Sequence, residues 1–238
     1  MRLALAGLAA LLAVALALGP VLRPRPVPPR TPLGLFTSLP ILWGEAADLK
    51  DLLQQDAPPH WARAVVERRH RIVPLDTLVR LEGLRALLVA QPRALLPQEN
   101  VALDRWVRGG GRVLLFADPM LTWDSAFPVR DRRRPQDVAL LSPILARWGL
   151  DLRFDERQPA GLREIAGSAL PVNLAGAFAL RPGGVARCRI TDAGLVAQCR
   201  IGAGRAVIVA DSALLEPGEN AGAGAAALDS LMDRAFGG

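Results

Sequence analysis

The chain has 238 residues, of which 51% are hydrophobic and 22% are charged, and its formal net charge is +6 at pH 7. This composition excludes a disordered chain and a membrane protein with many spans, and two cysteines exclude a four-thiolate zinc site or an iron–sulfur cluster held by this chain alone. Lys50 is the only lysine, and the arginine bias accompanies abundant Ala, Gly and Pro, which is typical of a GC-rich genome. We therefore expect no nucleic-acid partner despite the positive charge.

The N-terminal segment, residues 1–22, is apolar. Twenty consecutive uncharged residues run from Leu3 to Leu22, and a helix of that length crosses about 30 Å of hydrocarbon. We interpret the segment as a transmembrane anchor; the alternative is a cleaved signal peptide, since small residues near position 15 resemble a cleavage site. Residues 23–32 form a Pro- and Arg-rich linker, which favours stiff polyproline II structure.

Residues 33–238 are predicted to form one α/β domain, because short apolar runs alternate with helical patterns, as in a largely parallel sheet covered by helices. The expected strands are 33–42, 72–73, 86–90 and 112–117, followed by 150–154, 185–190, 195–201 and 206–210 in a β-rich second half that begins near residue 150. The expected helices are 45–55, 58–69, 76–83, 97–108, 136–148 and 222–236. The long polar stretch 118–135 is typical of a functional loop.

Polar side chains at the ends of the expected strands form a candidate ligand-binding site. Asp118 and Asp211 each follow a strand directly, and the carboxyl ends of strands in an open α/β sheet meet at the crevice where ligands bind. A structural role in a turn or helix cap is the alternative for each aspartate. The candidates are Ser38, Trp43, Glu45, Asp118, Asp211 and Ser212.

No catalytic constellation is found in the sequence. The only histidines, His60 and His70, lack metalloprotease spacing, and a capping or solvent-facing role is favoured for both. No serine lies in a Gly-x-Ser-x-Gly elbow, and no cysteine follows a parallel strand. The glycines 109–111 lie between a helix and a strand, the reverse of a phosphate loop, so they are interpreted as a helix cap. We expect no catalytic residue, metal or cofactor.

The two cysteines lie on neighbouring expected strands. A hairpin centred between Ala193 and Gly194 places Cys188 opposite Cys199, with Cα atoms about 4.5–5.5 Å apart, which is within disulfide reach. A bulge at Gly194 would shift this register, and the alternative is then a pair of small buried hydrophobic residues. If bonded, the pair indicates an oxidising compartment such as a periplasm.

Three segments resemble the auxiliary-component family of ABC transporters, of the gliding-motility type and its relatives. They are Leu87–Ala90, Leu96–Pro119 with its Gly-Gly-Gly and Asp-Pro, and Gly204–Ser212. The resemblance implies an α/β three-layer sandwich with a mostly parallel sheet, flavodoxin-like or class I glutamine-amidotransferase-like, with Asp118 where that class has a catalytic cysteine. It also implies an extracytoplasmic domain that works with an ABC permease and ATPase.

The leading interpretation is a non-enzymatic, membrane-anchored accessory or binding domain of an ABC-type transport system. It would be a single-pass inner-membrane protein with its domain in the periplasm, although the arginines after residue 22 favour the cytoplasm by the positive-inside rule. Two alternatives stay open. One is a cell-envelope hydrolase that uses Glu45, Asp118 or Asp211 as general acid or base, and the other is a cytoplasm-facing adaptor.

Overall fold

The computed structural model describes residues 30–45, 59–218 and 221–237. The expected anchor 1–22, most of the linker and nearly all of the expected helix 45–55 lie outside these residues. Residues 31–238 form one compact unit. Within the described ranges, no helix combines the length and the apolar character needed to cross a membrane.

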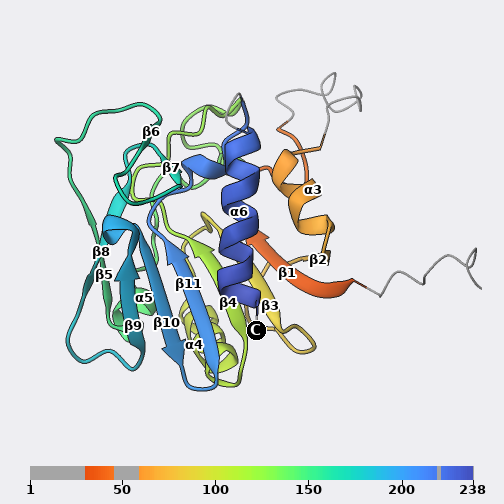
Figure 1. Ribbon diagram of the computed structural model, residues 1–238. Helices are drawn as coiled ribbons and strands as arrows, with labels where there is room; N and C mark the ends of the chain where they lie inside the picture. Colours follow the sequence, from red (N-terminus) through yellow and green to blue (C-terminus); the bar gives the residue numbers. More distant parts are fainter. Residues whose placement is uncertain (1–29, 46–58, 219–220, 238) are drawn as a thin grey trace, which may run out of the picture. The chain divides into compact units, whose positions relative to one another are not determined.

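A seven-stranded sheet lies at the centre of this unit (Figure 1). Across the sheet, the strands are β2 (His70–Pro74), β1 (Thr31–Thr37), β3 (Ala86–Ala90), β4 (Arg112–Phe116), β11 (Gly204–Val209), β10 (Val196–Ile201) and β9 (Arg187–Thr191). The neighbours from β2 to β11 pair in parallel, whereas β10 is antiparallel to both β11 and β9. The sheet is therefore mixed.

Helices lie on both sides of the sheet. Figure 1 shows α6 (Ala221–Phe236) on one side, next to α3 (Trp61–Glu67), and α4 (Pro97–Arg108) and α5 (Ser142–Trp148) on the other. Proline at the first position of α4 suits a helix start because its missing amide would have no partner there, and the Glu99 carboxylate accepts a bond from the Leu96 amide. Gly149 ends α5 in a left-handed conformation with φ +86°.

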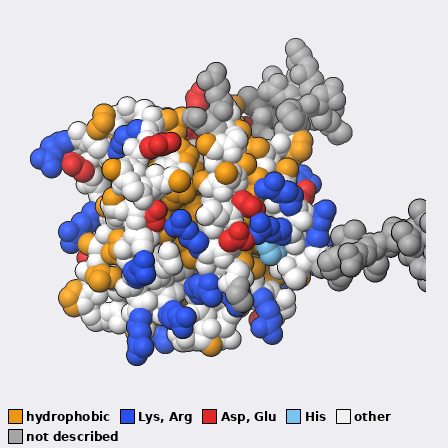
Figure 2. All heavy atoms as spheres, viewed as in Figure 1, with side chains coloured by type: hydrophobic (Ala, Val, Ile, Leu, Met, Phe, Trp, Pro, Cys, Tyr) orange, Lys and Arg blue, Asp and Glu red, His pale blue; other side chains and the backbone are white. Residues whose placement is uncertain are grey.

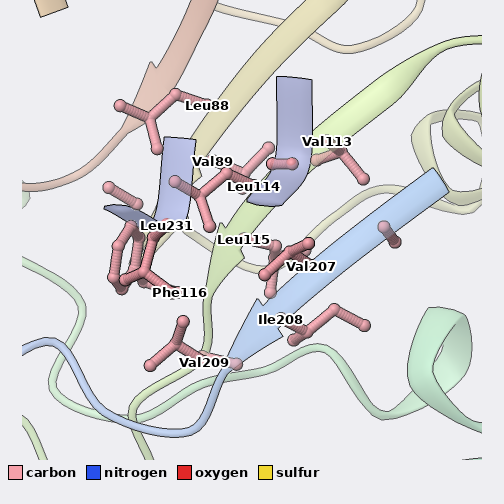
Figure 3. Close-up of a cluster of buried hydrophobic side chains, with 14 of the residues drawn as sticks. Leu88, Val89, Val113, Leu114, Leu115, Phe116, Val207, Ile208, Val209 and Leu231 are labelled. Atoms are coloured by element: carbon pink, nitrogen blue, oxygen red, sulfur yellow. The ribbon is translucent and has the colours of Figure 1, made fainter. Parts of the chain in front are cut away.

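The core lies around the central strands. All five residues of β3 are buried, and β4 and β11 each have four consecutive buried apolar residues. Figure 3 shows Val89, Leu115 and Ile208 among the packed side chains of these strands. Parallel strands covered on both faces have continuous apolar runs for this reason, and these runs made the strands recognisable in the sequence.

Smaller elements complete the unit. Two short antiparallel sheets pair β5 (Leu150–Phe154) with β8 (Gly176–Leu180) and β6 (Arg163–Glu164) with β7 (Pro171–Val172). Single 3-10 turns are η1 (Asp192–Gly194) and η2 (Ala213–Leu215).

Two of the expected helices are wrong or too long. Residues 76–83 form turns, because the Glu99 carboxylate accepts bonds from the Thr77 hydroxyl and the Leu78 amide and so replaces helical partners. The helix expected from Gln136 begins only at Ser142. The preceding residues instead bond the loop after β4, for example from the Ala139 amide to the Asp118 carbonyl at 2.7 Å.

The predicted fold class is corrected accordingly. The expectation was a flavodoxin-like or class I glutamine-amidotransferase-like sandwich with a mostly parallel sheet, a C-terminal antiparallel hairpin and an N-terminal transmembrane helix. The structure has a mixed sheet of seven strands. The expected antiparallel hairpin is present as β9 and β10, and β11 is antiparallel to β10 as well, because a tight turn at Gly202 joins these two strands. No described helix spans a membrane.

Candidate active site

Two aspartates meet at the carboxyl ends of β4 and β11. These strands are parallel neighbours with Phe116 opposite Val209, so Asp118 and Asp211 follow equivalent positions at one edge of the sheet. Both are buried, with 0% and 1% of their surface exposed. The sequence placed them at a common edge, and the sheet order makes them immediate neighbours.

Asp118 accepts two hydrogen bonds from backbone amides. Its Oδ1 accepts from the Met120 amide at 2.8 Å and its Oδ2 from the Ser212 amide at 2.9 Å, so the carboxyl joins the turns after both strands. Burial first, and then the nearby Glu216 charge, raise the pKa of Asp118 to about 7 against the lowering effect of the two amides.

Asp211 has a similar environment. Its carboxyl accepts bonds from the Asn173 amide at 2.9 Å and from the Ala213 amide. Burial first, and then the charge of Asp118, raise the pKa of Asp211 well above its ordinary value. Because two neighbouring carboxylates in a buried site repel each other, the pair holds a proton at a pH where isolated aspartates have lost theirs.

Glu216 is the third carboxyl of the site and the one that reaches solvent. It follows η2 and is half-buried, and its Oε1 accepts a bond from the Thr122 hydroxyl. Burial raises the pKa of Glu216. Asn173 Nδ2 donates to Thr122 Oγ1 at 3.1 Å, so hydrogen bonds run from Asp211 through Asn173 and Thr122 to Glu216. We call Asp118, Asp211 and Glu216 the carboxyl cluster.

Gln91 holds the backbone of Asp118 through its side-chain amide. It was not identified as a site residue from the sequence. It is fully buried after β3, with a positive φ of 42°. Its Nε2 donates to the carbonyls of Asp118 and Gln136 at 3.0 and 2.9 Å, and its Oε1 accepts from the Asp118 amide at 2.9 Å. The signal was present: a polar residue follows a buried strand at the same sheet edge.

Of the other predicted ligand-binding residues, only Ser212 lies at the cluster. Ser212 is fully buried, and its hydroxyl has no hydrogen-bond partner among the described residues. Ser38 donates to the Gln91 carbonyl and accepts from the Gln136 amide at 2.9 Å. Glu45 accepts from Ser125 Oγ at 2.9 Å and from the Ala126 amide at 2.6 Å, while Trp43 is 71% exposed. Ser38 therefore bonds the residue directly after the 118–135 stretch and Glu45 bonds residues within it, and neither joins the carboxyls.

The histidines have structural roles. His60 Nδ1 accepts a bond from the Ala62 amide at 3.1 Å and caps α3, which confirms the capping interpretation. Its ring stacks on Trp123 at 5.7 Å between centroids, and burial lowers its pKa. His70 Nδ1 lies 2.9 Å from the Thr31 hydroxyl and joins β2 to β1. Gly109 forms the C-cap of α4, also as predicted.

Cys188 and Cys199 are joined by a disulfide across β9 and β10, with Cα atoms 4.0 Å apart. In the described part of the chain, no three His, Cys, Asp or Glu side chains are grouped so that they could hold a metal ion. A pocket of about 370 Å³ lies beside Trp106 and Gly109–Gly111. These residues precede β4, so the pocket lies at the opposite end of the strand from the carboxyl cluster.

Comparison with known proteins gives only distant structural matches. No family model and no curated protein matches the chain. A β-galactosidase from Rahnella sp. R3 matches with 12% identity and a TM-score of 0.45, over 87% of this chain and 31% of that one. The exo-β-1,4-mannosidase Op5Man5 from Opitutaceae bacterium strain TAV5 matches with 13% identity and a TM-score of 0.43, over 86% and 33% of the two chains. The chain thus spans about a third of these enzymes, and scores this low assign neither fold nor activity.

The interpretation as a non-enzymatic, membrane-anchored transporter accessory domain is corrected by these findings. Within the described residues, no helix is long and apolar enough to span a membrane, and the expected anchor 1–22 lies outside them. The expected open binding rim is also absent at its two central residues, since Asp118 and Asp211 are buried and bonded within the chain. What the strand ends form is a cluster of carboxyls with raised pKa values.

Proposed function

We propose that the chain is a hydrolase of the cell envelope whose carboxyl cluster performs general acid–base catalysis. The observation that carries this proposal is the set of three carboxyls at one sheet edge whose pKa values are all raised, that of Asp118 to about 7. A carboxyl with a raised pKa keeps its proton to higher pH, which suits it to protonate a leaving group.

In this mechanism Glu216 contacts the substrate, because it is the half-buried member of the cluster. Its carboxyl gives a proton to the leaving oxygen, and the resulting carboxylate takes a proton from the attacking water, so Glu216 returns to its starting state. Asp211 is a positioning residue that acts through Asn173 and Thr122, and the nearby Asp118 charge favours the protonated form of Asp211.

The disulfide supports the cellular location in this proposal. Such bonds persist in oxidising compartments and are rare in the cytosol of most organisms. The Cys188–Cys199 bond is therefore consistent with a domain that works outside the cytoplasm.

The test is hydrolysis of a panel of chromogenic esters, phosphates and glycosides by the purified full chain. Glu216→Gln keeps the side-chain shape but removes the transferable proton, and we expect it to lower kcat at least about 100-fold. Asp155→Asn is the matched control, because Asp155 is an exposed carboxyl paired with Arg157. Absence of turnover across the panel, or full activity of Glu216→Gln, would overturn the proposal, and thermal unfolding of each variant establishes that it is folded.

A further inference from the structure

Four arginines lie in register across four neighbouring strands. Arg187 of β9 pairs with Arg200 of β10, Arg200 pairs with Arg205 of β11, and Arg205 pairs with Arg112 of β4. Residues opposite each other in a sheet point to the same face. The four side chains therefore form a line about 14 Å long on one face, because neighbouring strands lie about 4.8 Å apart. We call this line the arginine row.

Half of the arginine row caps a helix. Arg205 Nη1 donates to the carbonyls of Arg234 and Gly237 at 3.0 and 3.2 Å, and Arg112 donates to the Phe236 carbonyl. These contacts satisfy the last carbonyls of α6 and place a cation at the negative end of its dipole. They also identify the face: the row lies on the side of the sheet that carries α6.

The other half of the row extends beyond α6 into solvent. Arg187 and Arg200 are exposed, and so is Arg189, which follows two residues along β9 on the same face. Within the described part of the chain, these three guanidinium groups make no ion pair or hydrogen bond to another residue. Figure 2 shows basic side chains gathered over this end of the sheet, beside the end of α6. We call Arg187, Arg189 and Arg200 the arginine face.

The like charges of the arginine face repel one another, and a disulfide holds their two strands together. Like charges directly opposite on paired strands destabilise the pairing, and Arg187 and Arg200 are such a pair. The neighbouring residues Cys188 and Cys199 point to the other side of the sheet and form the disulfide that joins the two strands. The crosslink therefore fixes three uncompensated cations on a rigid surface, and an anionic partner would relieve their repulsion.

We propose that the arginine face docks an extended acidic segment of a partner polypeptide. Arg187 and Arg200 lie side by side across two strands, and Arg189 lies next to Arg187 along β9. This narrow arrangement fits a single polypeptide chain better than a broad bilayer surface. Arg187 and Arg189 are about 7 Å apart along the strand, which matches alternate side chains of an extended peptide. A guanidinium group binds a carboxylate through two parallel hydrogen bonds.

Nucleic acid fits the arginine face less well. Single strands bind proteins by stacking bases on aromatic side chains, and β9 and β10 contain no aromatic residue. The disulfide beneath the face also indicates a compartment outside the cytosol, where nucleic-acid partners are not expected.

The test measures binding of the full chain to a fluorescent ten-residue peptide that alternates Glu and Thr, by anisotropy at several salt concentrations. We expect salt-sensitive binding that weakens at least tenfold in Arg187→Gln/Arg189→Gln/Arg200→Gln. The matched control is Arg71→Gln/Arg80→Gln/Arg85→Gln, which removes the same charge from exposed positions near β2 and β3 and should stay within twofold of wild type.

Two further arms distinguish the sources of negative charge. A single-stranded oligonucleotide replaces the peptide in one arm, and vesicles of phosphatidylglycerol are compared with vesicles of phosphatidylcholine in the other. Equal peptide binding by the triple variant and the wild type would overturn the proposal. So would tighter, arginine-face-dependent binding of the oligonucleotide, or of the anionic vesicles, than of the peptide. Circular dichroism melting of both triple variants establishes that they are folded.

Discussion

Asp118 illustrates at the scale of one residue how burial changes chemistry. A carboxylate that accepts two amide bonds would ordinarily have a low pKa, yet desolvation outweighs both amides and raises the value to about 7. Glu99 is the opposite case. It is also fully buried, but the Arg93 guanidinium binds its carboxylate and lowers its pKa to about 2. The pKa values differ in direction because a cation, Arg93, binds the Glu99 carboxylate, whereas the charged group near Asp118 is another carboxylate, Glu216.

The raised pKa of Asp118 predicts a pH-dependent stability. Between about pH 4 and pH 7 the folded chain keeps a proton at Asp118 that the unfolded chain has lost, so this group makes the free energy of unfolding fall as pH rises. The slope for one such group is at most about 1.4 kcal/mol per pH unit. Urea denaturation of Asp118→Asn and wild type from pH 4 to 8 should show a shallower fall in the variant. Asp155→Asn should show the same pH dependence as wild type. If the difference in unfolding free energy between wild type and Asp118→Asn does not change with pH, the raised pKa of Asp118 is contradicted.

At the scale of elements, local signals located strands and helices where local chemistry decides them. The strand 86–90 and the helix from Pro97 to Arg108 were predicted with the bounds that the structure shows, because continuous apolar runs, a first-turn proline and a terminal glycine act over a few residues. The segments 76–83 and 136–141 were wrong because Glu99 and Asp118, distant in sequence, take their backbone groups. The strands β6–β8 were missed because their short segments lack period-two patterning.

Two glycines of α6 give a matched prediction about helix packing. Ala normally stabilises a helix interior by about 1 kcal/mol over Gly, and a Cβ at Gly222 would meet nothing within 4 Å, so Gly222→Ala should stabilise the chain by about 0.5–1 kcal/mol. A Cβ at Gly224 would lie 2.4 Å from the Leu214 carbonyl oxygen, so Gly224→Ala should destabilise by about 1–3 kcal/mol.

Denaturant midpoints of the two variants beside wild type measure this directly. Opposite shifts are expected although both changes are the same substitution in the same helix. Stabilisation by both would mean that α6 does not pack against η2 as closely as these contacts require.

At the scale of the whole molecule, the disulfide connects fold, charge and location. It crosslinks the antiparallel end of the sheet, where the sheet order places β9 at an edge. It also lies under the arginine face, so part of the net charge of +6 is concentrated over a covalently fixed surface. The carboxyl cluster lies at the carboxyl end of β11 and the arginine row at its other end, so the proposed chemistry and the proposed docking do not share residues.

Loss of the disulfide should destabilise the whole unit. The two cysteines are 11 residues apart, and closing a loop of that size in the unfolded chain is worth about 3 kcal/mol. Reductant should therefore lower the denaturant midpoint of wild type, while Cys188→Ala/Cys199→Ala should have a lowered midpoint that reductant does not change further. A wild-type midpoint that is insensitive to reductant, with free thiols present by mass mapping, would contradict this expectation.

The sequence by itself determined the local features of this protein: the apolar strands, the proline start and glycine end of α4, and the polar residues after β4 and β11. Each depends on interactions within a few residues, so local patterning is enough. Only the tertiary structure decided that Gln91, Thr122, Asn173 and Glu216 surround the two aspartates, and that four arginines from four strands form one row. The pairing of β4 with β11, which brings Asp118 to Asp211 and Arg112 to Arg205, joins residues about 90 positions apart, for which the sequence carries no local signal.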